Sequence, residues 1–201
     1  MDKESLVKKF GDEYYANEDT YHMGIHYQLA EPIAQRFKGY KLCLDACVGA
    51  GFTTLFLAKY VDNILAVDVN HTHLEQARYN SQIAYTEKKI EFVEGNVLEV
   101  IDSIDFDSAF LDPDWAKAGD NKENHVFELS DMVPNTELLL KKVFTKTKNI
   151  CLRLPKEFDL QKLNDFPTHE SEAVYQDARL KFYCVYFGDL IKTEGTSELR
   201  V

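Results

Sequence analysis

The sequence lacks the features that mark membrane-spanning, secreted and repeat proteins. None of its 201 residues falls in an apolar run of the roughly 18 residues that a membrane-spanning helix needs. The first ten residues, MDKESLVKKF, have no apolar core of signal-peptide length. No internal repeat or low-complexity stretch is present. We therefore expect a cytoplasmic protein with one main globular domain.

Positive charge is also scarce. The chain has 23 Lys and Arg residues against 34 Asp and Glu residues, a formal net charge of −11. A protein that holds nucleic acid through a broad basic face carries the opposite balance. A nucleotide, or the end of an RNA, is still compatible with this charge.

Cysteine and histidine are too few and too scattered for a metal site. Cys43 and Cys47 have neither a second cysteine pair nor a histidine pair at zinc-binding spacing. We expect buried thiols and no metal. His71 and His73 stand two apart at the start of a predicted helix, which favours two surface side chains on different faces.

The most informative stretch is 42–54, which predicts a strand, a glycine turn and the start of a helix. An apolar run ends in Asp45, and Gly49 and Gly51 follow before helix-forming residues. This arrangement presents backbone N–H groups to a nucleotide-like ligand. Thr54 stands where a dinucleotide fingerprint has its third glycine, which favours S-adenosylmethionine. An acid at the strand end, Asp45, can meet the ammonium group of its methionine part.

Strands and helices then alternate as in βαβ units. A second predicted strand, 63–69, ends at Asp68, near the spacing at which an acid accepts hydrogen bonds from ribose hydroxyls. A third strand leads to Asn96, which can lie beside an adenine ring, and a fourth, 107–111, leads to Asp112. Carboxyl ends of parallel strands share one edge of a sheet, so we expect these side chains to converge on one crevice.

The remaining chain completes a class I methyltransferase (Rossmann-like) α/β fold. We expect a seven-stranded, mostly parallel sheet with a terminal antiparallel hairpin formed by strands near 169–175 and 180–190. Residues 1–38, with helical patterning over 5–15 and 28–37, form an N-terminal helical extension, and 39–201 form the S-adenosylmethionine-dependent methyltransferase domain. The polar residues 116–134 are expected to form a mobile lid.

These motifs resemble the family of RNA cap guanine-N2 methyltransferases, or trimethylguanosine synthases, over residues 25–192. The family's D-A-F-C-G-V-G-G is similar to DACVGAG at 45–51, and its K-I-E-F-x-x-G-D to KIEFVEGN at 89–96. Its Leu-Pro-Arg is similar to LPK at 154–156, and its ending to YFGDLI at 186–191. Its tryptophan after the fourth strand matches Trp115. The resemblance implies methylation of a guanine exocyclic amine.

Three departures from the family fall near the expected substrate site. The family has S-P-P-W where this chain has DPDW, so Asp114 replaces a proline. Asn96 replaces an aspartate on the adenine side. The family's W-F-S-V-T-P-E is only loosely similar to IHYQLAE at 25–31.

Methyl transfer to a weakly nucleophilic amine depends on alignment of the acceptor. Asp112 and the carbonyl of Pro113 are suited to accept hydrogen bonds from the guanine amine, and Trp115 is suited to stack on the base, with cation–π attraction if the base is 7-methylguanine. Asp114 can attract that cation, or cap the following loop. The predicted catalytic residues are Asp112, Pro113 and Trp115, and the predicted substrate residues are Asp114 and Trp115. The predicted cofactor-binding residues are Asp45, Ala46, Gly49, Gly51, Thr53, Thr54, Asp68, Val69, Asn96, Val97 and Asp112.

Two other functions are compatible with the sequence. A small molecule or a protein amine could be the acceptor, which the acidic charge and Asp114 favour. A methyltransferase-like subunit without activity could bind a partner instead, although the intact set of Asp45, Gly49, Gly51 and Asp68 argues against it.

Overall fold

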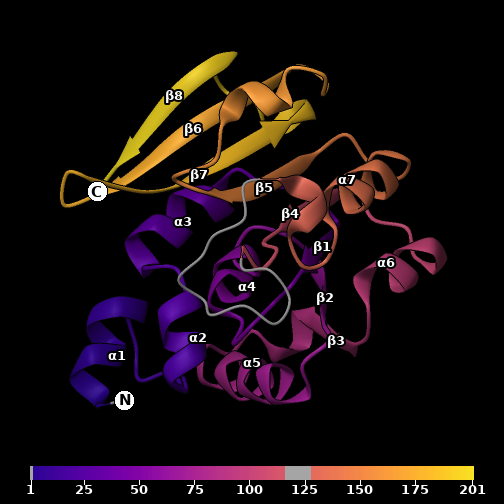
Figure 1. Cartoon of the computed structure of the whole chain (residues 1–201). Coiled ribbons are helices and arrows are strands. Elements are labelled where there is room, and N and C mark those ends of the chain that lie inside the picture. Colours follow the sequence, from indigo (N-terminus) through magenta and orange to yellow (C-terminus); the bar gives the residue numbers. More distant parts are fainter. Residues whose placement is uncertain (1, 116–127) are drawn as a thin grey trace. The chain divides into compact units, whose positions relative to one another are not determined.

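The computed structural model describes residues 2–115 and 128–201 (Figure 1). The chain divides into two compact units, an N-terminal unit that ends at Asn96 and a C-terminal unit that begins at Val97. The predicted boundary between residues 38 and 39 does not coincide with this division. The separation of an N-terminal extension from a methyltransferase domain therefore stays a prediction.

The N-terminal unit is built on three parallel strands in the order β3-β2-β1. Buried, mostly apolar residues fill β1 and β2, as expected for strands covered by helices on their faces, whereas β3 has the sequence IEFVE and is only partly buried. Their bounds are β1 Leu42–Ala46, β2 Asn63–Asp68 and β3 Ile90–Glu94, with helices α4 Phe52–Leu57 and α5 His71–Ile83 and the 3-10 turn η1 Glu87–Lys89. In register, Asp45 lies opposite Ala66 and Asp68 opposite Glu94, so both acids stand at the carboxyl ends of neighbouring strands.

Three helices precede β1, namely α1 Lys3–Phe10, α2 Glu18–Met23 and α3 Tyr27–Gln35. The helix expected over 5–15 ends early because Gly11 takes a left-handed backbone conformation, φ 88°, which terminates α1. Helix α2 is absent from the sequence-based prediction. It begins at Asn17, whose side chain accepts from the Thr20 N–H while the Thr20 hydroxyl accepts from the Asn17 N–H.

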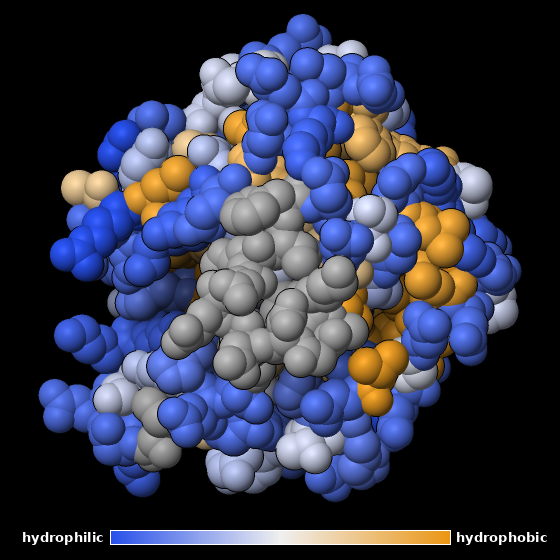
Figure 2. Space-filling model, viewed as in Figure 1, coloured by the Kyte–Doolittle hydropathy of each residue, from blue (hydrophilic) through white to orange (hydrophobic). Residues whose placement is uncertain are grey.

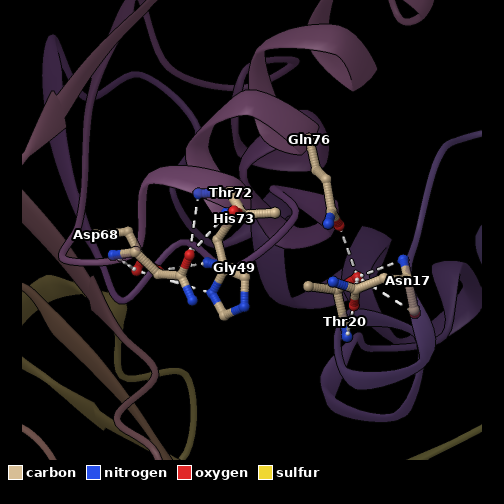
Figure 3. Close-up of polar contacts among 8 residues, drawn as sticks. Asn17, Thr20, Gly49, Asp68, Thr72, His73 and Gln76 are labelled. Carbon is tan, nitrogen blue, oxygen red and sulfur yellow. Dashed lines mark hydrogen bonds and ion pairs between the residues drawn. The ribbon is translucent and has the colours of Figure 1, made fainter.

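This N-terminal segment packs on the glycine turn and on α5. Phe10 stacks on Phe52, the first residue of α4, with ring centroids 3.5 Å apart. The buried amide of Asn80 donates to the carbonyl oxygens of Tyr15 and Ala50 and accepts from the Tyr15 N–H. A further hydrogen bond joins the Thr20 hydroxyl of α2 to Gln76 of α5, 2.7 Å apart (Figure 3). One side chain, Asn80, thus connects the N-terminal segment to the turn after β1.

The C-terminal unit contains five strands in the order β4-β5-β7-β6-β8. Strands β4 and β5 are parallel, β7 is antiparallel to β5 and β6, and β8 is parallel to β6. The strand bounds are β4 Ser108–Leu111, β5 Ile150–Pro155, β6 His169–Gln176, β7 Arg179–Phe187 and β8 Gly195–Arg200. The helices are α6 Val97–Val100 and α7 Thr136–Phe144, with the 3-10 turns η2 Ile101–Ser103, η3 Leu129–Asp131, η4 Leu160–Leu163 and η5 Gly188–Leu190.

The antiparallel hairpin predicted near the end of the chain is formed by β6 and β7. Its two-residue loop, Asp177 and Ala178, has positive φ at both positions, the backbone of a tight hairpin turn. The mixed α/β fold class is confirmed. The count of seven strands is wrong, because β8 adds an eighth strand among the described residues, and the hairpin is therefore not the last element of the sheet.

Strand β8 is attached through a buried carboxylate on β6. Glu170 accepts from the backbone N–H groups of Lys192 and Thr193 and from the hydroxyl of Ser197. Burial of a carboxylate is tolerated when hydrogen-bond donors surround it. The polar sequence of β8, GTSELR, gave no apolar signal for a strand. Its position is set by its parallel backbone pairing with β6 and by this tertiary contact.

The surface is largely hydrophilic on the face shown in Figure 2, with apolar residues in separate places. In residues 2–115 and 128–201, no helix is both long and apolar enough to cross a membrane. Nor do the described residues contain a group of three or more His, Cys, Asp or Glu side chains arranged to hold a metal ion.

Candidate active site

The glycine turn after β1 uses its two glycines differently. Gly49 has φ 55°, and a Cβ added to it would meet nothing within 4 Å. Gly51 has φ 81°, and a Cβ added there would lie 3.0 Å from the Cβ of Ala77 on α5. The space above Gly49 is thus open to a ligand, whereas Gly51 is required by the left-handed backbone and by the close packing of α5.

Asp45, at the end of β1, is buried and oriented by Thr54. The Thr54 hydroxyl donates to Asp45 Oδ2 at a distance of 2.6 Å. Thr54 is itself buried, in the first turn of α4. The residue that replaces the third glycine of a dinucleotide fingerprint therefore fixes the rotamer of the strand-end acid.

Asp68, at the end of β2, is held by the backbone on both of its oxygens (Figure 3). Gly49 N–H donates to Oδ2 and Asn70 N–H donates to Oδ1, each at 2.8 Å. A carboxylate offers about four acceptor sites, so these two bonds leave lone pairs for a diol. The first bond also fixes the glycine turn against the end of β2.

The side chains beside Asp68 and Asp45 differ in exposure. Val69 is 68% exposed, an apolar surface directly after Asp68. Ala46 and Thr53 are buried. Asn96 is exposed after β3, and Val97, the first residue of the C-terminal unit, is buried at the start of α6. An exposed valine next to a buried acid suits the flat apolar face and polar hydroxyls of a nucleoside.

His73 is a site residue that the sequence reasoning missed. Its side chain is 17% exposed and its Nδ1 lies 3.8 Å from Asp68 Oδ1, whereas the side chain of His71 is 67% exposed. The surface interpretation is correct for His71 and wrong for His73. Asn70 caps α5 by accepting from Thr72 N–H and His73 N–H, and this turns His73 toward Asp68 (Figure 3).

In the C-terminal unit, Asp112 follows β4 and forms an ion pair with Arg153 of β5. Arg153 Nη1 lies 2.8 Å from Asp112 Oδ2, and neither side chain is more than 20% exposed. Burial raises the pKa of Asp112 to about 6, the Arg153 guanidinium opposes this rise, and Asp114 adds to it. Asp112 therefore changes charge near pH 6, above the range of an ordinary aspartate.

Trp115 packs against the same arginine. The centroid of its ring lies 4.8 Å from the Arg153 guanidinium carbon, and Trp115 Nε1–H donates to the Arg153 carbonyl oxygen at 3.3 Å. On β7, Phe182 contacts the guanidinium at 5.0 Å from its ring centroid. Arg153 is thus a second residue that sequence reasoning missed, since it stands inside the apolar strand ICLRLP.

Pro113 is buried and Asp114 is exposed. The backbone of Asp114 pairs with Val133, with N–H to oxygen distances of 2.8 and 3.1 Å in the two directions. Of the expected lid at 116–134, residues 116–127 lie outside the described residues, and the part that follows forms η3 and the Val133 pair.

The structure thus brings Asp45, Gly49, Thr54 and Asp68 together with His73 in the N-terminal unit, and Asp112, Trp115 and Arg153 together in the C-terminal unit. The convergence of Asp112 with the strand ends of the N-terminal unit stays a prediction.

Several solved structures with similar folds are assigned as methyltransferases. A Porphyromonas gingivalis W83 protein assigned as a methyltransferase matches with a TM-score of 0.77 at 17% identity, covering 91% of this chain and 47% of that one. A Klebsiella pneumoniae protein assigned as an O-methyltransferase matches with a TM-score of 0.61 at 15% identity, covering 85% of this chain and 86% of that one. A Streptococcus mutans protein assigned as a methyltransferase, in complex with SAH, matches with a TM-score of 0.59 at 13% identity, covering 80% of this chain and 95% of that one. The chain spans about half the length of the P. gingivalis protein.

The fold and the glycine turn with its strand-end acids are those of the class I methyltransferases, the class whose cofactor is S-adenosylmethionine. Residues 40–190 match the family model of the RNA cap guanine-N2 methyltransferases, and the chain belongs to this family.

Proposed function

We propose that this protein transfers a methyl group from S-adenosylmethionine to the exocyclic N2 amine of a guanine, in a nucleotide or in a cap-like RNA end. The observation that carries this proposal is the sequence Asp112-Pro113-Asp114-Trp115 after β4, in a chain of the guanine-N2 family. It supplies a largely buried carboxylate, paired with Arg153, and, three residues later, the single tryptophan of the chain.

The N-terminal unit supplies the cofactor-binding residues in this proposal. Asp68 accepts hydrogen bonds from the ribose hydroxyls through the lone pairs left by its two backbone donors, and Val69 covers one face of the adenine. Asp45, oriented by Thr54, accepts from the methionine ammonium. Gly49 leaves room for the ligand, and Ala46, Gly51, Thr53 and Asn96 are the other cofactor-binding residues of this unit. Val97 and Asp112, which the sequence also predicts to bind the cofactor, belong to the C-terminal unit. When bound, S-adenosylmethionine supplies a methyl group already activated on a sulfonium.

Two glycines of the N-terminal unit, Gly49 and Gly39, give a matched test of the cofactor site. Both Gly49 and Gly39 have positive φ, 55° and 92°, and a Cβ added to either meets nothing within 4 Å. Each change to alanine is expected to cost roughly 1–2 kcal/mol of folding free energy, the penalty of a left-handed backbone. Only Gly49→Ala is expected to weaken S-adenosylmethionine binding, at least tenfold by calorimetry. Equal affinity in the two variants would contradict the placement of the cofactor above Gly49.

The C-terminal unit supplies the acceptor-binding residues. A guanine amine is a weak nucleophile because its lone pair is delocalised into the ring. Asp112, when ionised, and the carbonyl oxygen of Pro113 accept from its two N–H groups, which directs the lone pair toward the methyl group. Trp115 stacks on the base, and Asp114 contacts its polar edge.

A second acceptor class is favoured by Asp114, an exposed carboxylate where the family has proline. A negative charge at this position, in a chain of net charge −11, repels the phosphates of RNA. The same charge attracts amines, so a small amine or a protein side chain is the alternative acceptor.

The experiment that separates these acceptors is mass-spectrometric detection of methyl transfer to 7-methyl-GDP, GDP and uncapped RNA in parallel. Transfer to a guanine acceptor supports the proposal, and restriction to 7-methyl-GDP makes the enzyme cap-specific. No transfer to any of the three, in samples where cofactor binding is measured, would overturn the guanine assignment in favour of the alternative.

A further inference from the structure

We propose that Arg153 is the positioning residue of the acceptor site, because it holds both Asp112 and Trp115 in place while contacting no reacting atom itself. This inference rests on the proposed function for its meaning in catalysis, but its geometry can be tested without any acceptor.

Arg153 orients Asp112 through its side chain. The guanidinium Nη1 lies 2.8 Å from Asp112 Oδ2, a charge-assisted hydrogen bond that fixes one carboxylate oxygen. The other oxygen, Oδ1, is then directed by the planar geometry of the pair. A carboxylate with one oxygen anchored in this way presents the second in a defined direction.

Arg153 orients Trp115 through both its backbone and its side chain. The carbonyl oxygen of Arg153 accepts from the indole N–H at 3.3 Å, and the guanidinium lies over the indole ring. Phe182 packs against the guanidinium as well. A planar cation stacks on aromatic rings in a way that an ammonium group does not. One residue therefore fixes the plane of the tryptophan and the rotamer of the acid.

The position of Arg153 within β5 carries a desolvation cost in folding free energy. All six residues of the strand are buried, and the neighbours of Arg153 along the strand are leucines. A charged side chain in such a strand must be paired, and desolvation cancels much of the Coulombic gain of a buried pair. The contribution of the ion pair to folding stability therefore does not by itself account for an arginine at this position.

The charge of Asp112 depends on two neighbouring groups. Arg153 of β5 favours its ionised form, and Asp114 of the same loop opposes it, while burial also favours the neutral acid. When the guanidinium is removed, burial and the charge of Asp114 remain, and both favour protonated Asp112. The pKa of Asp112 is then expected to rise further above its value of about 6 in the unmodified chain.

Because Trp115 is the single tryptophan, its fluorescence reports on this site alone. We expect the emission excited selectively from tryptophan to change with a midpoint near pH 6 as Asp112 ionises, and this transition to vanish in Asp112→Asn. In Arg153→Met, which keeps a long apolar stem between Trp115 and Phe182, the midpoint is expected to rise by about one pH unit or more, the effect of removing a nearby opposite charge. Arg179→Met, an exposed arginine at the start of β7, is the matched control and should leave the midpoint unchanged.

An unchanged midpoint in folded Arg153→Met would overturn the proposal, as would a transition in the original chain that survives Asp112→Asn. The second of these results needs no variant of Arg153, so the test stands even where Arg153→Met fails to fold. Where a guanine acceptor is methylated, kcat is expected to fall in Arg153→Met while the affinity for the cofactor is kept. Arg153→Lys keeps the positive charge, so it is expected to restore the midpoint of the Asp112 transition, but not the stacking on Trp115. If no guanine acceptor is methylated but the fluorescence behaves as expected, the proposed function fails and the positioning role of Arg153 stands.

Discussion

Replacing Asp112 by asparagine is expected to reduce kcat for methyl transfer by roughly 100-fold or more, comparable to the loss of one preorganised hydrogen-bonding group in other active sites. The amide keeps the size of the side chain but loses the charge that attracts the acceptor amine. Affinity for S-adenosylmethionine, measured by calorimetry, is expected to stay nearly unchanged if Asp112 acts on the acceptor. A large loss of cofactor affinity would instead assign Asp112 to the cofactor alone.

The pH dependence of the unmodified enzyme gives an independent check on Asp112. The carboxyl group has a pKa raised to about 6. Only its ionised form can accept hydrogen bonds on both oxygens, one from Arg153 and one from the acceptor amine. Activity is therefore expected to rise with pH through about 6 and to be lost below it. Asp105→Asn, at an almost fully exposed aspartate of the same unit that pairs with Lys146, is the control and should keep both kcat and the pH profile.

Replacing Asp68 by alanine is expected to weaken S-adenosylmethionine binding by roughly 100-fold or more. The change removes two acceptor sites for the ribose, and hydrogen bonds to a charged group contribute about 1.5–3 kcal/mol each. It also leaves the N–H groups of Gly49 and Asn70 without their acceptor, which loosens the glycine turn. Calorimetric titration with S-adenosylmethionine measures the effect.

Asp62→Asn is the matched control for Asp68, because Asp62 is an exposed aspartate directly before β2, at the opposite end of the same strand. Its affinity for S-adenosylmethionine is expected to equal that of the unmodified chain. Equal losses in Asp62→Asn and Asp68→Ala would point to damage to the strand, and unchanged affinity in Asp68→Ala would refute the ribose assignment.

The parts of the structure that sequence could predict are those with strong local signals. The turn at 45–51 was predictable because an apolar strand, two glycines and a helix stand in order, and β1, β2 and β3 follow the same alternation. The hairpin of β6 and β7 was predictable from two β-rich stretches around a short polar loop. Each of these features depends mainly on residues close together in the chain.

The unpredicted parts depend on contacts between distant residues. Strand β8 has a polar sequence, and its attachment depends on Glu170 of another strand. Arg153 stands among apolar residues, and its role became visible only when Asp112 and Trp115 were seen to contact it. His73 was assigned to the surface because spacing along a helix does not show that Asn70 directs its side chain to Asp68.

The amide of Asn80 couples the opening of the glycine turn after β1 to the segment that precedes β1. Because it bonds Tyr15 and Ala50 at once, the segment before β1 cannot detach without releasing the carbonyl group of the turn. Segments joined in this way exchange their amide hydrogens as one cooperative unit. A cofactor bound against the turn would therefore slow hydrogen exchange at Tyr15, which lies between α1 and α2. The N-terminal segment and the turn behave in this respect as a single foldon.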